Sequence, residues 1–165
     1  MKKNVLFVFG LLLIGIFSFS QGVAQSPAIT SESANVKVTY GQPSKKGREI
    51  FGKLVPFGQV WRTGANSATE VTFKKDVNFG GKTVKAGTYS LFTVPNQGEW
   101  EVILNSELKQ WGAYGYEKVK DKNVTQIKVK SMKTDAEVEK LTITASDSEI
   151  KIEWDTTVVK IALKW

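Results

Sequence analysis

The sequence predicts an all-β domain, an antiparallel sandwich or jelly-roll-like fold of about nine short strands. Apolar and polar residues alternate with a period of two through most of the chain, which is typical of strands that bury one face. No long segment has the 3.6-residue period of an amphipathic helix, so we expect at most one or two short helical turns. The 165 residues are 41% apolar and 24% charged, the composition of a globular protein rather than a disordered chain.

The first 24 residues have the pattern of a secretory signal peptide. Lys2 and Lys3 carry positive charge ahead of residues 5–19, an uncharged and mostly apolar run of 15 residues. The small residues Gly22 and Ala24 then stand at the positions that precede a cleavage site. Because the apolar run is shorter than the roughly 20 residues of a membrane-spanning helix, we expect cleavage rather than a transmembrane anchor.

Processing divides the chain into three expected parts. They are the signal peptide over residues 1–24, a flexible lead over residues 25–34, and a single β-rich domain over residues 35–165. The mature protein is expected to begin at Gln25 and to be exported to the periplasm or the outside of the cell. No cysteine follows the apolar run, which excludes lipid attachment of the bacterial lipoprotein type.

Each predicted strand follows from its own alternation or from the turns beside it. Gly80-Gly81 is typical of a two-residue hairpin turn. Residues 88–94 are apolar on both faces, which predicts a central strand, and the turn at 95–98 makes a hairpin with the next strand. A polar turn at 146–148 joins two later strands. In chain order, the predicted strands cover residues 36–40, 70–74, 76–79, 82–84, 88–94, 99–105, 124–130, 140–145, 149–154 and 158–163.

Two glycine-containing segments interrupt this pattern. In residues 106–116, Ser106 could cap one helical turn over 106–109, and residues 111–116 predict an aromatic loop. Residues 41–69 contain five glycines and two prolines together with seven large apolar side chains. Because so much apolar surface must be buried, we expect this second segment to pack as a structured cap over one end of the sheet.

Several strings of the chain resemble a family of exported proteins from Gram-negative bacteria. They are YGQPSKKGR at 40–48, IFG at 50–52, LVPFG at 54–58, VWRTGAN at 60–66, AGTYSLF at 86–92 and WGAY at 111–114. From about residue 36 to its end, the chain resembles the family called domain of unknown function 2911. The resemblance implies export and a single β-rich domain, and it implies no activity or catalytic residue. One departure is Gln42, at a position where an arginine is expected.

Composition excludes several kinds of active site. The chain has no cysteine and no histidine, which rules out disulfides, thiol nucleophiles, the usual zinc sites and a Ser-His-Asp triad. We predict no catalytic residue, no metal and no cofactor. The formal charge of +7 indicates a solvated surface of mixed charge, and we expect no nucleic-acid partner because export is expected and the chain lacks a basic RNA-binding motif.

The best candidates for a binding site lie in the string WRTGAN. Arg62 could bind a carboxylate or phosphate through two parallel hydrogen bonds, and Asn66 could bind a sugar hydroxyl. The alternative is structural: Arg62 would satisfy loop carbonyls or pair with an acid, and Asn66 would adopt a left-handed turn conformation. Lys46 and Arg48 add positive charge in the same segment and are further candidates for ligand binding.

Aromatic side chains in the loop at 111–116 are candidates for stacking on a sugar ring. We predict that Trp111 and Tyr114 are exposed there, and that at least one of them lies near Arg62 at the main surface cleft. The ligand would be a glycan or an anionic component of the cell envelope. The alternative is that these rings belong to the core.

Alternation also assigns opposite roles to two neighbouring residues. If residues 60–62 are locally extended, their side chains point alternately to opposite sides. Trp61 would then be buried beside Phe51 and Phe57, while Arg62 would face the cleft.

Three functions remain open from the sequence. The first is a non-enzymatic binding module that acts on a glycan, an anionic envelope component or another protein. The second is a hydrolase with paired carboxylates, for which Glu49, Glu70 and Glu99 are candidates. The third is a structural component of an envelope assembly. An Arg62 side chain that lines a concave pocket with aromatic walls would favour the first.

Overall fold

The computed structural model describes residues 25–165, which contain nine strands, the short helix α1 (Tyr116–Val119) and one turn of 3-10 helix (Lys120–Lys122). The predicted signal peptide and its cleavage site lie outside the described residues, apart from Gln25 itself. The strands are β1 (Ala28–Glu32), β2 (Val36–Gly41), β3 (Thr69–Phe73), β4 (Val77–Phe79), β5 (Lys82–Val84), β6 (Gly87–Val94), β7 (Glu99–Asn105), β8 (Asn123–Ala145) and β9 (Glu149–Lys164).

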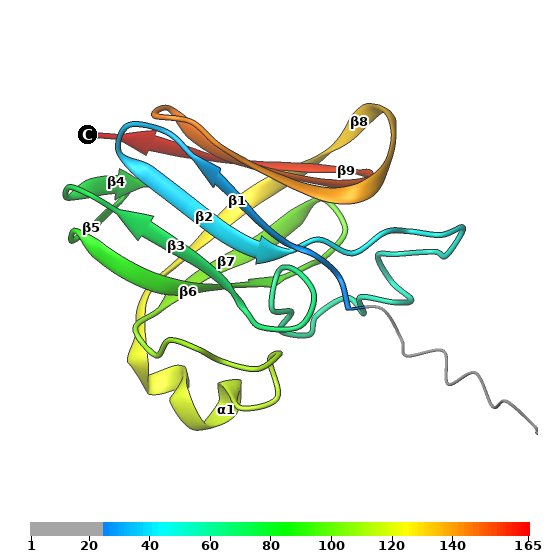
Figure 1. Cartoon of the computed structure of the whole chain (residues 1–165), viewed down its shortest axis with the longest axis horizontal. Helices are drawn as coiled ribbons and strands as arrows, with labels where there is room; N and C mark the ends of the chain where they lie inside the picture. Colours follow the sequence, from blue (N-terminus) through cyan, green and yellow to red (C-terminus); the bar gives the residue numbers. More distant parts are fainter. Residues whose placement is uncertain (1–24) are drawn as a thin grey trace, which may run out of the picture.

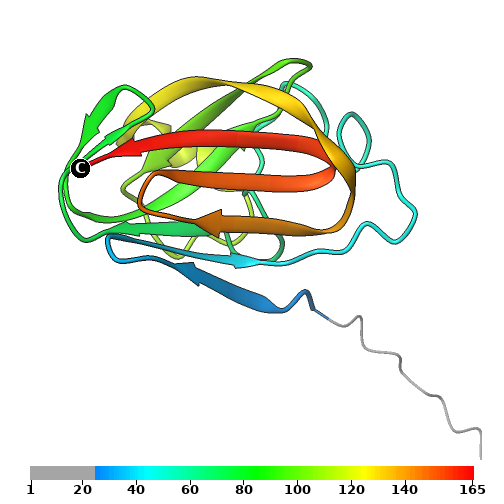
Figure 2. The ribbon, with the colours of Figure 1, turned by 90° about the horizontal axis from the view of Figure 1, so that it is seen from above.

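All strands pair antiparallel in one sheet with the order β1-β2-β3-β6-β7-β8-β9-β4-β5. The sheet folds over on itself, so that the long β8–β9 hairpin lies above the strands β2, β3, β6 and β7 (Figure 1; Figure 2). The prediction of an all-β antiparallel fold with about nine strands and very little helix is confirmed.

Strand β8 carries the chain from the lower layer to the upper one. Its first part pairs with β7, and its second part pairs with β9. The register shifts between Lys133 and Val138 and again between Val138 and Thr142, so that extra residues stand on β8. Extra residues of this kind bend a strand and increase its twist, which lets a single strand belong to both layers.

The prediction of short strands is therefore wrong at the C-terminal end of the chain. The two strands expected at 124–130 and 140–145 are parts of the 23-residue strand β8. Those expected at 149–154 and 158–163 are parts of the 16-residue strand β9, in which Asp155 has a positive φ of 55°. Irregular positions inside a continuous strand resemble strand ends in a sequence pattern.

The main core lies between the two layers. Trp100 of β7 and Trp154 of β9 are almost fully buried, and each ring contacts Phe51 and Trp61 from the segment between β2 and β3. The ring centroids in this cluster are 4.9 to 6.3 Å apart. Residues 41–69 thus pack on one end of the sheet, as predicted, and supply two of the four aromatic rings of this cluster.

A second, smaller core covers the outer face of β6 and β7. Phe92 and Ile103 pack there against Ala68 and Tyr116, so β6 is buried on both faces, as predicted for a central strand. The expected helical turn at 106–109 is wrong, because the helix begins at Tyr116 instead. Lys109 has a left-handed φ of 58°, a conformation that ends a helix.

The expectation of a flexible lead over residues 25–34 is wrong for β1. Strand β1 pairs with β2 over its whole length, from Ala28 opposite Gly41 to Glu32 opposite Lys37. None of its side chains is fully buried. The strand is held by backbone pairing at the edge of the sheet, by half-buried Ile29 against the main core, and by the Ala145 N–H of β8, which donates to the Ser31 hydroxyl at 2.9 Å. A hydrophobic pattern does not detect the backbone pairing.

Candidate functional site

The string WRTGAN lies where β3 stops pairing with β6. The pairing of β3 with β6 begins at Thr69 opposite Leu91. Further along β6, Trp61 pairs with Thr93 instead, through two backbone hydrogen bonds of 2.7 and 3.0 Å. The backbone N–H of Thr69 then donates to the carbonyl of Arg62 at 3.0 Å. Residues 62–69 consequently form a closed loop that is anchored on the central strand.

Buried threonines fix the inside of this loop. Thr63 is fully buried with a left-handed φ of 55°, and its hydroxyl lies 3.0 Å from that of Thr93 on β6. The Thr69 hydroxyl donates to the Thr63 carbonyl at 2.8 Å. These bonds satisfy the polar groups of a backbone conformation that a β-branched residue adopts only at a cost.

Trp61 has the environment that the alternation predicts. It is 8% exposed in the main core, where its ring contacts Phe51, while Val60 packs on the opposite face of the sheet. The prediction for Phe57 is wrong: Phe57 is 38% exposed and lies over Gly52 instead. Gly52 has a positive φ of 94°, and a Cβ there would be 2.9 Å from the Phe57 ring.

Three neighbouring cavities surround the loop at 62–66. Cavity 1 has a volume of about 520 Å³, cavity 2 about 490 Å³ and cavity 3 about 330 Å³. Cavities 1 and 2 are both lined by Gln25, Ser26, Ala65 and Asn66. Cavities 2 and 3 are both lined by Leu54, Val55, Trp61 and Arg62. The three therefore adjoin one another around WRTGAN.

Cavity 2 concentrates a residue type that is rare in this chain. The 23 basic residues include only two arginines, Arg48 and Arg62, and both line cavity 2 together with Trp61 and Trp154. None of the described residues that line this cavity is acidic. The arrangement is a positively charged pocket with aromatic walls.

The two arginines differ in how they are held. Arg48 donates from Nε to the carbonyl of Lys45 at 2.9 Å and from Nη2 to the carbonyl of Ser44 at 2.6 Å, which orients its guanidinium. The side chain of Arg62 has no hydrogen-bond or ion-pair partner among residues 25–165, and its Nε is buried. Within residues 25–165, Arg62 therefore neither satisfies loop carbonyls nor pairs with an acid, and this is unusual because buried polar atoms almost always have a partner.

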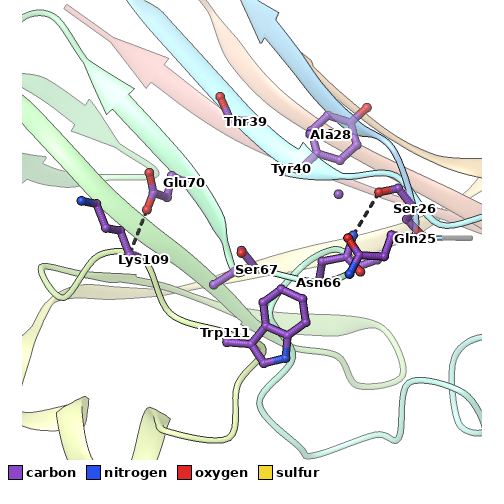
Figure 3. A pocket seen from close by; sticks show the side chains of 13 residues that line it. Gln25, Ser26, Ala28, Thr39, Tyr40, Asn66, Ser67, Glu70, Lys109 and Trp111 are labelled. Carbon is purple, nitrogen blue, oxygen red and sulfur yellow. Dashed lines mark hydrogen bonds between the residues drawn. The ribbon is translucent and has the colours of Figure 1, made fainter.

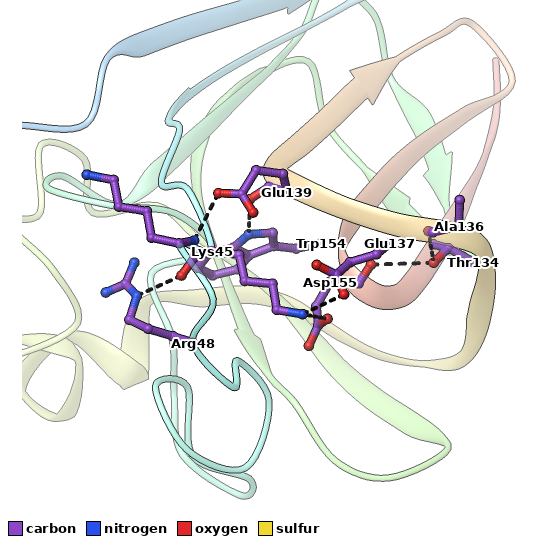
Figure 4. Close-up of polar contacts among 9 residues, drawn as sticks. Lys45, Arg48, Thr134, Ala136, Glu137, Glu139, Trp154 and Asp155 are labelled. Carbon is purple, nitrogen blue, oxygen red and sulfur yellow. Dashed lines mark hydrogen bonds and ion pairs between the residues drawn. The ribbon is translucent and has the colours of Figure 1, made fainter.

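Three carboxylates of β8 and β9 bind groups of residues 45 and 46 (Figure 4). Lys45 forms ion pairs with Asp155 at 2.6 Å and with Glu137 at 2.9 Å, and hydrogen bonds to both carboxylates raise the pKa of Lys45. The Glu139 carboxylate accepts the backbone N–H of Lys46 at 2.9 Å. Sequence reasoning missed Lys45, whose partner Asp155 is 110 positions away.

Two of the predicted site residues, Lys46 and Asn66, have side chains that lie outside the cavities or bind backbone. The side chain of Lys46 is exposed and lines none of the four cavities found in the described chain. Asn66 has a left-handed φ of 63°, and its side-chain amide donates to the carbonyl of Ser26 at 3.0 Å (Figure 3). Asn66 therefore fixes the residues ahead of β1 against the wall that separates cavities 1 and 2. Gln42 likewise binds backbone, the carbonyl of Leu141.

The aromatic loop is divided between two cavities. Trp111 is 59% exposed and lines cavity 1, whereas Tyr114 is 84% exposed and lines cavity 3 with Arg62. Tyr116 is buried against Phe92 and belongs to the second core. The largest of the four cavities is thus lined by Asn66 and Trp111, and Arg62 lines its two neighbours.

The carboxylates named for a hydrolase are scattered. Glu70 lines cavity 1, where it is the one acidic residue in the described lining, while Glu49 and Glu99 line none of the four cavities. Residues 25–165 contain no group of three or more acidic side chains placed to hold a metal ion. No helix in this part of the chain is long and apolar enough to cross a membrane.

Comparison with known proteins identifies one family. The family model described as protein of unknown function (DUF2911) matches residues 22–163. No curated protein and no solved structure matches the chain.

Proposed function

We propose that the chain, which belongs to the DUF2911 family of proteins of unknown function, acts as an exported, non-enzymatic binding protein for a small anionic ligand. The observation that carries the proposal is that the only two arginines of the sequence line the same cavity. The ligand group that this cavity recognises is a carboxylate or a phosphate.

Arg62 supplies the free binding capacity. A guanidinium presents parallel N–H donors that match the two oxygens of a carboxylate or phosphate. The buried Nε of Arg62 has no partner in the described chain, and an unsatisfied buried donor costs about 1–3 kcal/mol. The rest of the guanidinium also has no hydrogen-bond or ion-pair partner among residues 25–165, and Arg62 lines cavities 2 and 3, so its donors are available to an anion there.

The surroundings of the arginines favour an external anion over an internal one. Lys45 and the backbone of Lys46 occupy the carboxylates of Asp155, Glu137 and Glu139. None of the described residues that line cavity 2 is acidic, Glu49 beside Arg48 in the sequence included, and the rings of Trp61 and Trp154 form part of the cavity wall. Partial exclusion of water strengthens the attraction between guanidinium and anion.

Calorimetric titration with sodium acetate and sodium phosphate tests this proposal. Wild-type protein should bind at least one of the two anions, and Arg62→Gln should weaken that binding by about tenfold or more, because it removes a charge-assisted bidentate contact. Lys46→Gln is the matched control, since it removes the same charge from an exposed side chain that lines none of the four cavities.

Two results would contradict the proposal. One is the absence of acetate and phosphate binding by the wild-type protein at millimolar concentrations. The other is an equal loss of affinity in Arg62→Gln and Lys46→Gln, which would indicate a diffuse effect of net charge. Arg48→Gln should give an intermediate loss, because the Arg48 guanidinium already uses two donors on backbone carbonyls.

A further inference from the structure

Cavity 1, beside the arginine pocket, has an exposed tryptophan at its rim. Trp111 is 59% exposed, more than any other tryptophan among the described residues. A large aromatic ring left in water loses the stabilisation that burial would give it, about 1.5–3 kcal/mol for a large apolar side chain. This ring contributes little to the core, so its position calls for another explanation.

The backbone around Trp111 is fixed on both sides. The N–H of Gly112 donates to the carbonyl of Asn66 at 3.0 Å, and the N–H of Ala68 donates to the carbonyl of Gln110 at 2.8 Å. Trp111 therefore pairs as a single β-bridge with Ser67. A ring presented on a rigid backbone loses little entropy when a ligand covers it.

Some polar atoms at the same cavity also have no hydrogen-bond partner in the described chain (Figure 3). One oxygen of Glu70 accepts the backbone N–H of Lys109 at 3.0 Å, and the second oxygen has no hydrogen-bond partner in the described chain. That bond holds Lys109 in a left-handed conformation, and non-glycine residues in such conformations gather at functional sites. Ser67 adds an exposed hydroxyl at the rim.

We infer that cavity 1 is a saccharide subsite in which Trp111 stacks on a pyranose ring. A pyranose has a face of C–H groups, which suits the electron-rich face of an indole, and a rim of hydroxyls, which suits the Glu70 carboxylate and the Ser67 hydroxyl. The volume of about 520 Å³ lies in the range of small-molecule sites.

The position of cavity 1 beside the arginine pocket also favours an acidic substituent on the sugar. Cavities 1 and 2 have a common wall, made by residues 25–26 and 65–66. A sugar ring on Trp111 would lie in the cavity next to the one that Arg62 and Arg48 line, so an acidic substituent that extends past this wall would meet their positive charge. This inference rests on the proposed function and makes it more specific: the ligand is an acidic saccharide, and not a small anion alone.

D-glucuronate, D-glucose and acetate separate the two contributions, since they are the acidic sugar, the neutral sugar and the anion. Wild-type protein should bind D-glucuronate about three- to tenfold more tightly than acetate, the gain expected from one ring contact. Trp111→Ala should remove this gain and leave the affinity for acetate unchanged. Trp111→Phe should retain most of the gain, because it keeps an aromatic face.

Tyr114→Ala is the matched control, since Tyr114 is on the same loop and is more exposed but lines cavity 3. It should bind D-glucuronate as the wild type does. Equal affinity of wild type and Trp111→Ala for D-glucuronate would overturn the saccharide subsite while leaving the anion site intact. Equal affinity of the wild type for D-glucuronate and acetate would have the same meaning. If the wild type binds none of D-glucuronate, acetate and phosphate, the proposed function itself fails.

Discussion

Trp61 and Arg62 are neighbours in sequence and have opposite environments. Trp61 is buried among three aromatic rings, so Trp61→Ala should destabilise the domain by about 3–5 kcal/mol. Arg62→Ala removes a buried donor that has no partner in the described chain, so it should leave stability within about 1 kcal/mol of wild type or raise it. Denaturant unfolding of both variants measures the difference.

An equal loss of stability in the two variants would mean that Arg62 is a structural residue. In that case the guanidinium would be held by contacts with the loop, and the assignment of Arg62 to ligand binding would be wrong. The wild-type slope of free energy against denaturant should be kept in both variants, because a change of slope would signal an altered unfolded state rather than a lost contact.

At the level of single residues, the sequence predicted only part of the candidate site. The alternation through residues 60–62 correctly separated Trp61 from Arg62. The same sequence could not distinguish Lys45 from Lys46, because the difference lies in the ion pairs of Lys45 with carboxylates on β8 and β9. Asn66 matched the structural alternative, a left-handed turn, and its bond to Ser26 depends on the unforeseen position of the residues ahead of β1.

The end of β2 controls the position of the loop at 62–66. A Cβ at Gly41 would lie 2.1 Å from the carbonyl oxygen of Ala65, and the Gly41 carbonyl accepts the Ala65 N–H at 3.1 Å. Gly41→Ala should therefore push the loop away, at a cost of about 1–3 kcal/mol, and weaken anion binding. Thermal melts and acetate titration test both effects.

Gly115→Ala provides the comparison for Gly41→Ala. A Cβ there would meet the end of the flexible Gln110 side chain at 3.1 Å, and the backbone φ of −89° suits any residue. This variant should melt close to the wild type and bind acetate normally. A Gly41→Ala variant that behaves in the same way would show that the loop does not depend on the close contact with β2.

Asp147, in the turn between β8 and β9, joins that turn to the one between β1 and β2. Its carboxylate accepts hydrogen bonds from the Ser33 hydroxyl at 2.7 Å and the Asn35 N–H at 3.0 Å, and these bonds lower the pKa of Asp147. Because the pKa of Asp147 is lower in the folded state, its charged carboxylate stabilises the fold at pH values above 3.8, its ordinary pKa. This stabilisation is lost as the pH falls through the folded-state pKa. Asp147→Asn should therefore melt below the wild type at pH 6.

The melting difference between wild type and Asp147→Asn should shrink as the pH falls below 3.8. Asp121→Asn is the matched control, because the Asp121 side chain forms no hydrogen bond or ion pair with another described residue, and its melting difference should not follow this pattern. A constant difference for Asp147→Asn between pH 6 and pH 3 would mean that the turns are not joined through the charged carboxylate.

At the level of elements, the sequence predicted strands wherever side chains alternate between core and solvent. Strands β2, β3 and β7 were located for this reason, whereas the Gly80-Gly81 turn located the β4–β5 hairpin and an apolar run located β6. Strand β1 was missed because it has no fully buried side chain and its pairing with β2 is made by the backbone. The unity of β8 was missed because the bulges between Lys133 and Thr142 break the alternation without ending the strand.

For the whole molecule, the proposal of export predicts a defined mature chain. Cleavage after Ala24 would start the protein at Gln25, a residue that lines cavities 1 and 2. Intact-mass measurement on protein recovered from its native host should give the mass of residues 25–165. Recovery of the full-length chain in the inner-membrane fraction would contradict the proposal of export.

The central claim is that a guanidinium without a partner in the described chain awaits an anion, and the presence of only two arginines allows a direct test. Protein labelled with ¹⁵N-arginine gives two Nε–H signals in a nitrogen–proton correlation spectrum, and Arg62→Gln assigns them by removing one. On titration with D-glucuronate or phosphate, we predict a saturable shift of the Arg62 signal that exceeds the shift of the Arg48 signal. An Arg62 signal that stays in place throughout the titrations would contradict the account.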